Sequence, residues 1–374
     1  MERIRVGVVG CGLIAQLMHL PHLRELSDRF EVVALCDLSA TVVDEVGGDF
    51  GVAHRVTDVD ALLQEEMDAV LVLTSGNHAP VAIAAAAAGR HVFIEKPLCL
   101  RVTDGLELLN TAGRARARLM TGYMKRLDPA FLRLRSELDR MEDIRMVTFT
   151  TLESPEAPYF SHQRIRRASA SELGLQERLA VIRESDDRLV AEAIHSDDPA
   201  LVRSYRRVIL DSMVHDLNLV RAVLGEPERV EFADIGPHSV TTALRFHETR
   251  ALLTWIDLPG IAAYRQELQI LAPTRRAKLV FSSPYLRNLP TQLVLEGGDV
   301  GTARSWVTVE TVSYEEAFKH ELLEFHAAIE EGREPVPSGL DGLRDIALAE
   351  AIVASYLDGR PRERPTEIVT SPER

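Results

Sequence analysis

The sequence predicts an α/β protein whose two halves are built differently. Over about the first 120 residues, apolar strand-like runs alternate with helical patterns, which is typical of a parallel sheet with helical crossovers. After Tyr123 the strand-like runs follow one another at short spacing, which indicates an α+β region with an open, mostly antiparallel sheet. A chain of 374 residues exceeds a typical single core, so we expect two domains, at 1–123 and 124–374.

The first half shows strand patterns separated by helical ones. The expected strands are Ile4–Val9, Glu31–Cys36, Ala69–Leu73, the run ending at Ile94, and Leu119–Gly122. The expected helices are about Ile14–Leu26, an alanine-rich segment around Ala82–Ala88, and about Thr103–Arg116. Because the strands alternate with helices, they should lie parallel, with their carboxyl ends at one edge of the sheet.

The second half is dominated by short strands between turn residues. We expect strands at Met146–Leu152, Val230–Ile235, Val240–Phe246, Ala251–Ile256, Glu267–Leu271, Lys278–Phe281, Gln292–Leu295 and Trp306–Val309. Helices are expected at about Pro199–Leu224, Glu315–Glu331 and Asp341–Leu357, followed by a charged tail that should be poorly ordered. The segment 154–207 is a charged, partly helical insertion, which fits either a solvated excursion or a lid or subunit contact beside a site.

Composition and charge exclude several classes of partner. The formal net charge of -14, with no long basic segment, argues against binding to nucleic acid or to an anionic membrane surface. Three widely spaced cysteines without a Cys-x-x-Cys motif suit a reducing compartment, so we expect a cytoplasmic protein. The first residues run straight into a strand pattern without a signal-peptide core, and the alanine-rich run is too short to cross a bilayer.

A glycine turn after the first strand predicts a dinucleotide site. Gly10, Gly12 and Ala15 fit G-x-G-x-x-A, with Leu13 and Ile14 between them, and the turn joins a strand to a helix. Asp37 ends the second strand 22 positions after Ala15, where an acid that binds the ribose hydroxyls is expected. A carboxylate there repels a 2′-phosphate, and Leu38-Ser39 provides no guanidinium, so NAD is favoured over NADP.

Two further strand ends should open onto the same crevice. Thr74 and Asn77 follow the third strand, where Asn77 can cap the next helix or touch the cofactor, and His78 is either a surface histidine or a ligand contact. Glu95-Lys96-Pro97 ends the fourth strand, because Pro97 cannot donate to a ladder. Lys96 is therefore expected to hold an ammonium group at the mouth of the site.

An apolar helix at 208–219 carries the polar pair Asp211 and His215. Their i, i+4 spacing puts a carboxylate beside an imidazole, which suits a general acid/base, although such a pair alone is more often structural. Asp216 points about a quarter turn away and should cap or pair elsewhere. No second histidine lies at helical spacing, so we expect no metal site here.

Together these motifs resemble the glucose–fructose oxidoreductase / inositol dehydrogenase (Gfo/Idh/MocA) family over nearly the whole chain. The resemblance rests on the glycine turn, Thr-x-x-Asn at 74–77, Glu-Lys-Pro at 95–97, Gly-Tyr-Met-Lys-Arg at 122–126 and Asp-x-x-x-His-Asp at 211–216. It implies an N-terminal Rossmann fold, a C-terminal α+β domain, and an active site between them. It also implies a homodimer or homotetramer formed through the second domain, which would cover the open sheet face.

The resemblance assigns roles to individual residues. It implies a hydride transfer between NAD and a hydroxyl or keto carbon of a sugar, sugar derivative or cyclitol, with Lys96 on the reacting oxygen, His215 as acid/base and Asp211 supporting His215. A lyase or glycosidase that works through transient oxidation, and a non-catalytic dinucleotide sensor, are the alternatives. The expected cofactor-binding residues are Gly10, Gly12, Leu13, Ile14, Asp37, Thr74, Asn77, Glu95 and Lys96, and the expected substrate contacts are Tyr123, Lys125 and Arg126.

The chain departs from the family where the substrate pocket is expected. Many relatives carry a Gly-Gly run before the Asp-x-x-x-His helix, whereas Tyr205-Arg206-Arg207-Val208 precedes it here. Arg206, Arg207, Lys125 and Arg126 either bring positive charge for a phosphorylated or carboxylated sugar or pair with the many acidic residues. The segment Ser283–Arg287 is a further candidate to reach the site.

Overall fold

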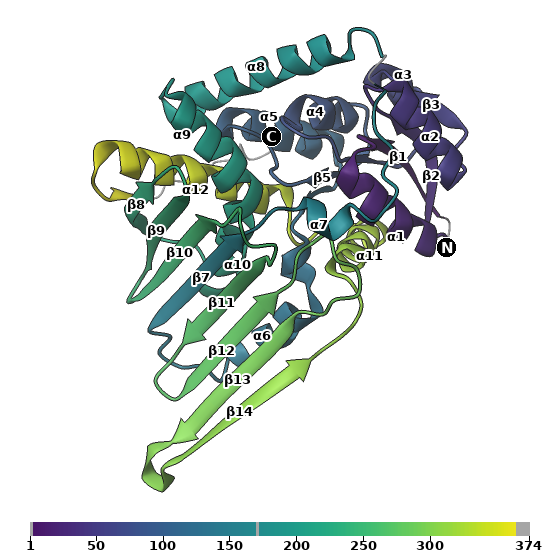
Figure 1. The fold of residues 1–374 in the computed structure, drawn as a ribbon. Coiled ribbons are helices and arrows are strands. Elements are labelled where there is room, and N and C mark those ends of the chain that lie inside the picture. The colour runs from purple at the N-terminus through teal and green to yellow at the C-terminus, as the bar shows by residue number, and fades with distance from the viewer. Residues whose placement is uncertain (1–2, 170–171, 364–374) are drawn as a thin grey trace.

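The computed structural model describes residues 3–169 and 172–363 and contains two sheets (Figure 1). The first sheet has six parallel strands in the order β3-β2-β1-β4-β5-β6, which confirms the parallel N-terminal sheet. Strands such as β4 are buried on both faces because helices cover both sides, which explains their continuous apolar runs. The strands are β1 (Ile4–Val9), β2 (Phe30–Cys36), β3 (His54–Val56), β4 (Ala69–Val72), β5 (His91–Glu95) and β6 (Leu119–Gly122).

Short polar side chains start several helices of this part. Ser39 accepts a hydrogen bond from the Val42 amide at the start of α2, and Asp58 does the same for Ala61 at the start of α3. The sequence did not predict α2, β3 or α3. The helices are η1 (Ala15–His19, π-helical), α1 (Leu20–Glu25), α2 (Ala40–Phe50), α3 (Val59–Leu63), α4 (Ala79–Ala87), α5 (Val102–Ala115) and η2 (Met124–Leu127, 3₁₀).

The second sheet has nine strands in the order β14-β13-β12-β11-β7-β10-β9-β8-β15. Its described pairs are antiparallel except β7 with β10, so the expectation of a mostly antiparallel sheet is confirmed. Buried and partly exposed residues alternate along β9, as in a sheet with one covered face. The strands are β7 (Met146–Glu153), β8 (Arg229–Ile235), β9 (Ser239–Phe246), β10 (Thr249–Asp257), β11 (Arg265–Leu271), β12 (Arg275–Phe281), β13 (Gln292–Asp299), β14 (Arg304–Thr311) and β15 (Arg362–Glu363).

Among the helices of the second part, α6 lies behind the second sheet in Figure 1, and α11 lies beside α1 of the first part. Leu322 and Phe325 of α11 pack into the same apolar cluster as residues of β1 and β2, which holds this helix against the first sheet. A capping box between Ser338 and Asp341 starts α12. The helices are α6 (Pro129–Leu138), α7 (Ala157–Phe160), α8 (Leu175–Ile194), α9 (Pro199–Ser204), η3 (Tyr205–Met213, π-helical), α10 (Val214–Leu224), η4 (Val300–Thr302), α11 (Ala317–Glu330) and α12 (Gly339–Asp358).

The described residues of the charged insertion lie over the helices of the first sheet, and most of α8 is exposed to solvent. Its long helix α8 runs across the top of the molecule in Figure 1, above α4 and α5. Arg166 forms an ion pair with Asp49 of α2, and Glu192 pairs with Arg101 next to α5. The insertion therefore lies beside the crevice in which the sequence places the cofactor.

Two other expectations need comment. The single helix expected at Pro199–Leu224 is interrupted, because Tyr205–Met213 forms a π-helical stretch between α9 and α10. The charged tail expected to be poorly ordered lies mostly at 364–374, outside the described residues. Within the described ranges, no helix is long and apolar enough to cross a membrane.

Candidate active site

Lys96 lies at the carboxyl end of β5 and contacts the second part of the chain. Its Nζ donates to Asp211 Oδ1 at 2.6 Å and to the Asp211 carbonyl oxygen at 2.7 Å. The Lys96–Pro97 peptide bond is cis. Two sequence-predicted catalytic residues, 115 positions apart, are thus joined where the two halves meet.

The Lys96–Asp211 pair is held in its charged form. Burial lowers the pKa of Lys96, but the charge and hydrogen bond of Asp211 outweigh this effect and raise that pKa above its ordinary value. For Asp211, partial desolvation raises the pKa, and the neighbouring Lys96 overcomes this and lowers it. Lys96 is therefore an ammonium donor over the physiological pH range and cannot act as a base.

His215 lies on α10 with its ring buried and packed edge-on against Tyr123, at 5.9 Å between ring centroids. Burial lowers its pKa well below the ordinary value, and the positive charges of Lys125 and Lys96 lower it further. The imidazole is consequently neutral near pH 7, the state required of a general base.

The structure gives Asp211 a different partner from the one expected. Among the described residues no hydrogen bond joins Asp211 to His215, and the buried His215 Nδ1 has no hydrogen-bond partner. Asp211 lies in the π-helical stretch η3, whose wider turn changes the relation of i and i+4 side chains. The carboxylate therefore orients Lys96 rather than the imidazole.

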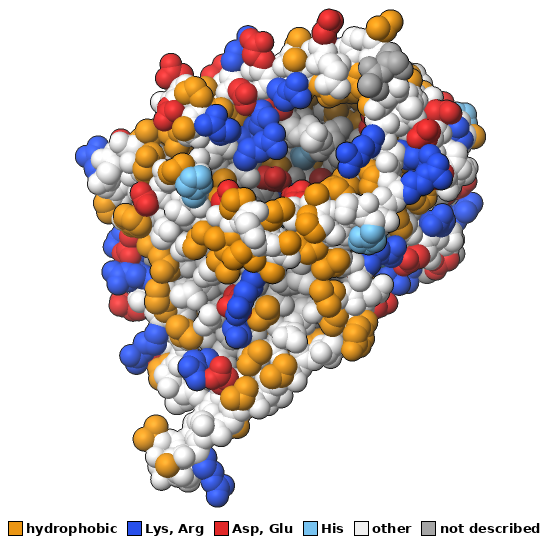
Figure 2. Space-filling model, viewed as in Figure 1, with side chains coloured by type: hydrophobic (Ala, Val, Ile, Leu, Met, Phe, Trp, Pro, Cys, Tyr) orange, Lys and Arg blue, Asp and Glu red, His pale blue; other side chains and the backbone are white. Residues whose placement is uncertain are grey.

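Acidic residues that sequence reasoning missed lie close to this pair. Figure 2 shows a hollow beneath α8 with acidic side chains in its floor. Burial raises the pKa of Glu156, and the charges of Asp211 and Glu153 raise it too. Tyr285 interacts with the carboxylates of Glu156 and Asp211, so the predicted segment Ser283–Arg287 reaches the site through this residue.

Lys125 belongs to a buried polar network beside His215. Its Nζ donates to Gln266 Oε1, and Gln266 Nε2 donates to Asp216 Oδ1 at 2.5 Å. Thr151 also donates to Asp216, at 3.0 Å. Burial lowers the pKa of Lys125 and raises that of Asp216, since neither charge is well solvated. As the sequence predicted, Asp216 pairs away from the Asp211 face.

The remaining expected basic residues find protein partners. Arg126 donates to the side-chain oxygen of Asn218 at 3.2 Å, and Arg206 forms an ion pair with Asp187 at 2.6 Å. Arg207 is exposed and lies near the charge of Asp211. Tyr123 is fully buried behind His215, which fits support of the imidazole better than direct contact with a substrate.

The glycine turn has the shape of a phosphate cradle. Gly10 has φ +97°, and a Cβ on it would lie 2.6 Å from the Thr74 amide nitrogen, so only glycine fits. A Cβ on Gly12 would meet nothing within 4 Å, so its backbone is open to a ligand. Asp37 accepts from the amides of Cys11 at 2.8 Å and Ser39 at 2.9 Å, which fixes its carboxylate beside the turn. These residues fit an NAD molecule bound along the turn.

The strand end after β4 is organised by hydrogen bonds. His78 is buried, so the surface-histidine reading is wrong, and its ring nitrogens contact the carbonyl oxygens of Thr74 and Pro97, each at 2.6 Å. Asn77, just before the N-cap residue His78, accepts from the Ala79 amide at the start of α4 at 3.2 Å. His78 thereby links the loop after β4 to the Glu-Lys-Pro segment.

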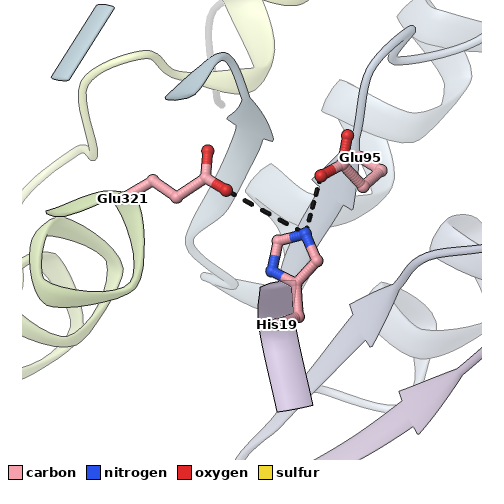
Figure 3. Close-up of side chains that lie close together, drawn as sticks. All are labelled: His19, Glu95 and Glu321. Carbon is pink, nitrogen blue, oxygen red and sulfur yellow. Dashed lines mark hydrogen bonds and ion pairs between the residues drawn. The ribbon is translucent and has the colours of Figure 1, made fainter. Parts of the chain in front are cut away.

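Glu95 is turned into the protein rather than toward the crevice (Figure 3). It accepts from the Lys96 amide at 3.1 Å and contacts His19 Nε2 at 2.6 Å, and Glu321 lies 4.0 Å from the same nitrogen. Glu321 is completely buried and neither of its oxygens has a hydrogen-bond partner. Burial, with the charge of Glu95, raises the pKa of Glu321 well above its usual range, so this carboxyl is protonated.

These three side chains also form a group of potential metal ligands, with ligand atoms within 4.8 Å of one another. The 2.6 Å contact between His19 and Glu95 has the length of a hydrogen bond. Two ligands of one tetrahedral zinc ion lie about 3.4 Å apart. His19 and Glu95 are thus hydrogen-bonded to each other, and Glu95 also accepts from the Lys96 amide.

Comparison with known proteins agrees with this geometry. Residues 4–123 match the model of the GFO_IDH_MocA family, described as an oxidoreductase family with an NAD-binding Rossmann fold. The match is accompanied by similarity along the whole chain to an inositol 2-dehydrogenase of Rhizobium meliloti (strain 1021), 26% identical and covering 96% of this chain and 98% of that protein. Residues 4–123 therefore belong to the Gfo/Idh/MocA oxidoreductase family, and the similarity to the inositol 2-dehydrogenase extends over the rest of the chain.

Two further relatives show the range of the family. The D-apiose dehydrogenase of Paraburkholderia graminis is 25% identical over 97% of this chain and 90% of that protein. A solved structure of levoglucosan dehydrogenase in complex with NADH and L-sorbose superposes with a TM-score of 0.76, covering 98% of this chain and all of that one at 18% identity. This chain therefore shares the fold of that structure.

Proposed function

We propose that the protein is an NAD-dependent dehydrogenase that interconverts a hydroxyl and a keto group on a sugar, sugar derivative or cyclitol. One observation carries the proposal: a charged Lys96 and a neutral His215, from opposite halves of the chain, lie close enough for the charge of Lys96 to act on the imidazole. Oxidation of a carbinol needs a base for the hydroxyl proton and a cation for the developing oxyanion. The named relatives support the substrate class.

The chain's residues divide this work between them. Bound NAD would supply the acceptor for the hydride, and Gly10, Gly12 and Asp37 would hold it. Lys96, oriented by Asp211, donates a hydrogen bond to the reacting oxygen and stabilises negative charge there. His215 takes the hydroxyl proton, because its depressed pKa leaves the imidazole free to accept it.

The carboxylates near Lys96 favour an uncharged substrate. Asp211, Glu153 and Glu156 lie near Lys96, and like charges repel at such distances. Arg206 is paired with Asp187 and cannot offer a free guanidinium to an anion. We therefore expect a neutral polyhydroxylated ring rather than the phosphorylated or carboxylated sugar that the basic residues first suggested.

Domain organisation, assembly and compartment follow as further proposals. We infer a cofactor domain at 1–123 and a substrate domain at 124–374, with the insertion joining them. One face of the nine-stranded sheet carries no helix in Figure 1, and Phe232, Val307 and Val309 are exposed on that face, so we infer a homodimer or homotetramer through this region, to be tested by light scattering. The three cysteines are unpaired and buried, which supports a cytoplasmic location.

A panel of neutral polyols tests the catalytic proposal. Purified protein is mixed with NAD and each candidate cyclitol or sugar, and NADH formation is followed by its absorbance. We expect net NADH with at least one neutral polyol and none with the matching sugar phosphates. Substrate consumption without net NADH would instead favour the transient-oxidation lyase, and cofactor binding without any turnover would favour the sensor.

A further inference from the structure

The insertion places a carboxylate on the turn that follows Asp37. Glu172 accepts a hydrogen bond from Ser39 Oγ at 2.6 Å and from the Ala40 amide at 2.7 Å. These donors stand at the start of α2, where an unpaired hydroxyl and amide would receive an anion. In this protein the carboxylate of Glu172, 133 positions after Ser39, already accepts hydrogen bonds from both donors.

The neighbouring contacts hold the insertion in this position. Arg178, at the start of α8, donates to the Leu38 carbonyl oxygen at 3.0 Å. Earlier in the insertion, the Arg166 amide donates to the Gln16 side chain at 2.8 Å, and Gln16 returns a hydrogen bond to the Arg166 carbonyl oxygen at 3.1 Å. The insertion is thus fastened both to the helix after the glycine turn and to the β2–α2 turn.

We propose that Glu172 is a specificity-determining residue that excludes NADP by occupying the place of its 2′-phosphate. This inference rests on the proposed function, because it concerns the cofactor that Asp37 would bind. NADP-binding proteins of this fold accommodate the 2′-phosphate with an arginine close to the ribose-binding acid. Here Ser39, Ala40 and Arg178 provide the donors that a phosphate needs, and Glu172 satisfies two of them and repels the phosphate.

Removing one charge from Glu172 provides the test. Affinities of the full-length protein for NADH and NADPH are measured by fluorescence titration without substrate. Wild type should bind NADH more tightly, and Glu172→Gln should shift the ratio of the two dissociation constants toward NADPH by about tenfold or more. Adding Arg178→Ala to this variant should remove most of the gain, since the guanidinium would hold the phosphate.

A matched control separates the effect of the Glu172 contact from the effect of removing one negative charge from the protein. Glu184 lies exposed on α8 without a hydrogen bond or ion pair in the described part of the chain, so Glu184→Gln removes the same charge and should leave the ratio unchanged. An unchanged ratio in Glu172→Gln, or an equal shift in Glu184→Gln, would overturn the proposal while leaving the dehydrogenase assignment intact. A wild-type protein that binds neither dinucleotide contradicts the proposed function itself.

Discussion

Replacing Lys96 by methionine is the most direct test of the catalytic arrangement. Methionine keeps most of the side chain's length and apolar stem but removes the ammonium that donates to Asp211 at 2.6 and 2.7 Å. Loss of a single donor to a developing oxyanion typically reduces kcat by about 10²–10³, equivalent to roughly 3–4 kcal/mol. We expect a loss of at least this size, because Lys96 is the charged donor on the reacting oxygen.

The same substitution should have little effect on folding. The side chain of Asp211 is 57% exposed, so water can solvate the carboxylate that loses its partner. Ion pairs with exposed members contribute about 0–1 kcal/mol to stability, and a change in the free energy of unfolding within that range is expected. Affinity for NADH in the absence of substrate should also persist, since the glycine turn is untouched.

The chain offers a close control for this experiment. Lys319 pairs with Glu315 at 3.4 Å, and the exposed fractions of the two side chains, 27% and 55%, resemble the 20% and 57% of Lys96 and Asp211. Lys319→Met should therefore show the same small effect on stability with normal turnover. Steady-state kinetics and chemical denaturation of both variants decide the matter, and a Lys96→Met enzyme within tenfold of wild-type kcat refutes the assigned role.

Three other predictions concern ionisation. Asp211→Asn removes the charge that keeps the pKa of Lys96 high, so burial will lower that pKa. The alkaline limb of the pH profile of kcat/KM should therefore move to lower pH, and an alkaline limb at its wild-type position contradicts this prediction. His215 stays neutral in the folded protein but binds a proton in the unfolded protein below about pH 6.5, so the free energy of unfolding decreases as the pH drops through that value. In chemical denaturation, His215→Gln should show a smaller decrease. Glu321 stays protonated when folded but ionises when unfolded above about pH 4.5, so stability falls as the pH rises. Glu321→Gln should remove the fall in stability at high pH and stabilise the protein by roughly 1–3 kcal/mol at alkaline pH. Thermal melts measure this effect, and a variant less stable than wild type at alkaline pH would contradict a protonated Glu321.

Much of the fold could be predicted from local patterns of apolar and polar residues in the sequence. Continuous apolar runs marked β1 and β4, since strands buried on both faces need no polar residues, and alternation marked strands such as β9. The elements β3 and α3 were missed because 3 and 5 residues are too few to show a periodicity, whereas α2 carries Val42, Val43 and Val46 at helical spacing and could have been predicted. The π-helical stretch η3 was missed because its hydrogen-bond register leaves no clear signature in residue type.

The sequence by itself determined the cofactor turn, the Lys96 strand end and the histidine helix, because each is a local motif whose chemistry depends on neighbouring residues. The tertiary structure decided which groups meet. Asp211 serves Lys96 rather than His215, and Glu172 lies on Ser39, through contacts between residues more than a hundred positions apart. Such contacts depend on how sheets and helices pack in space, and residue spacing along the chain does not encode them.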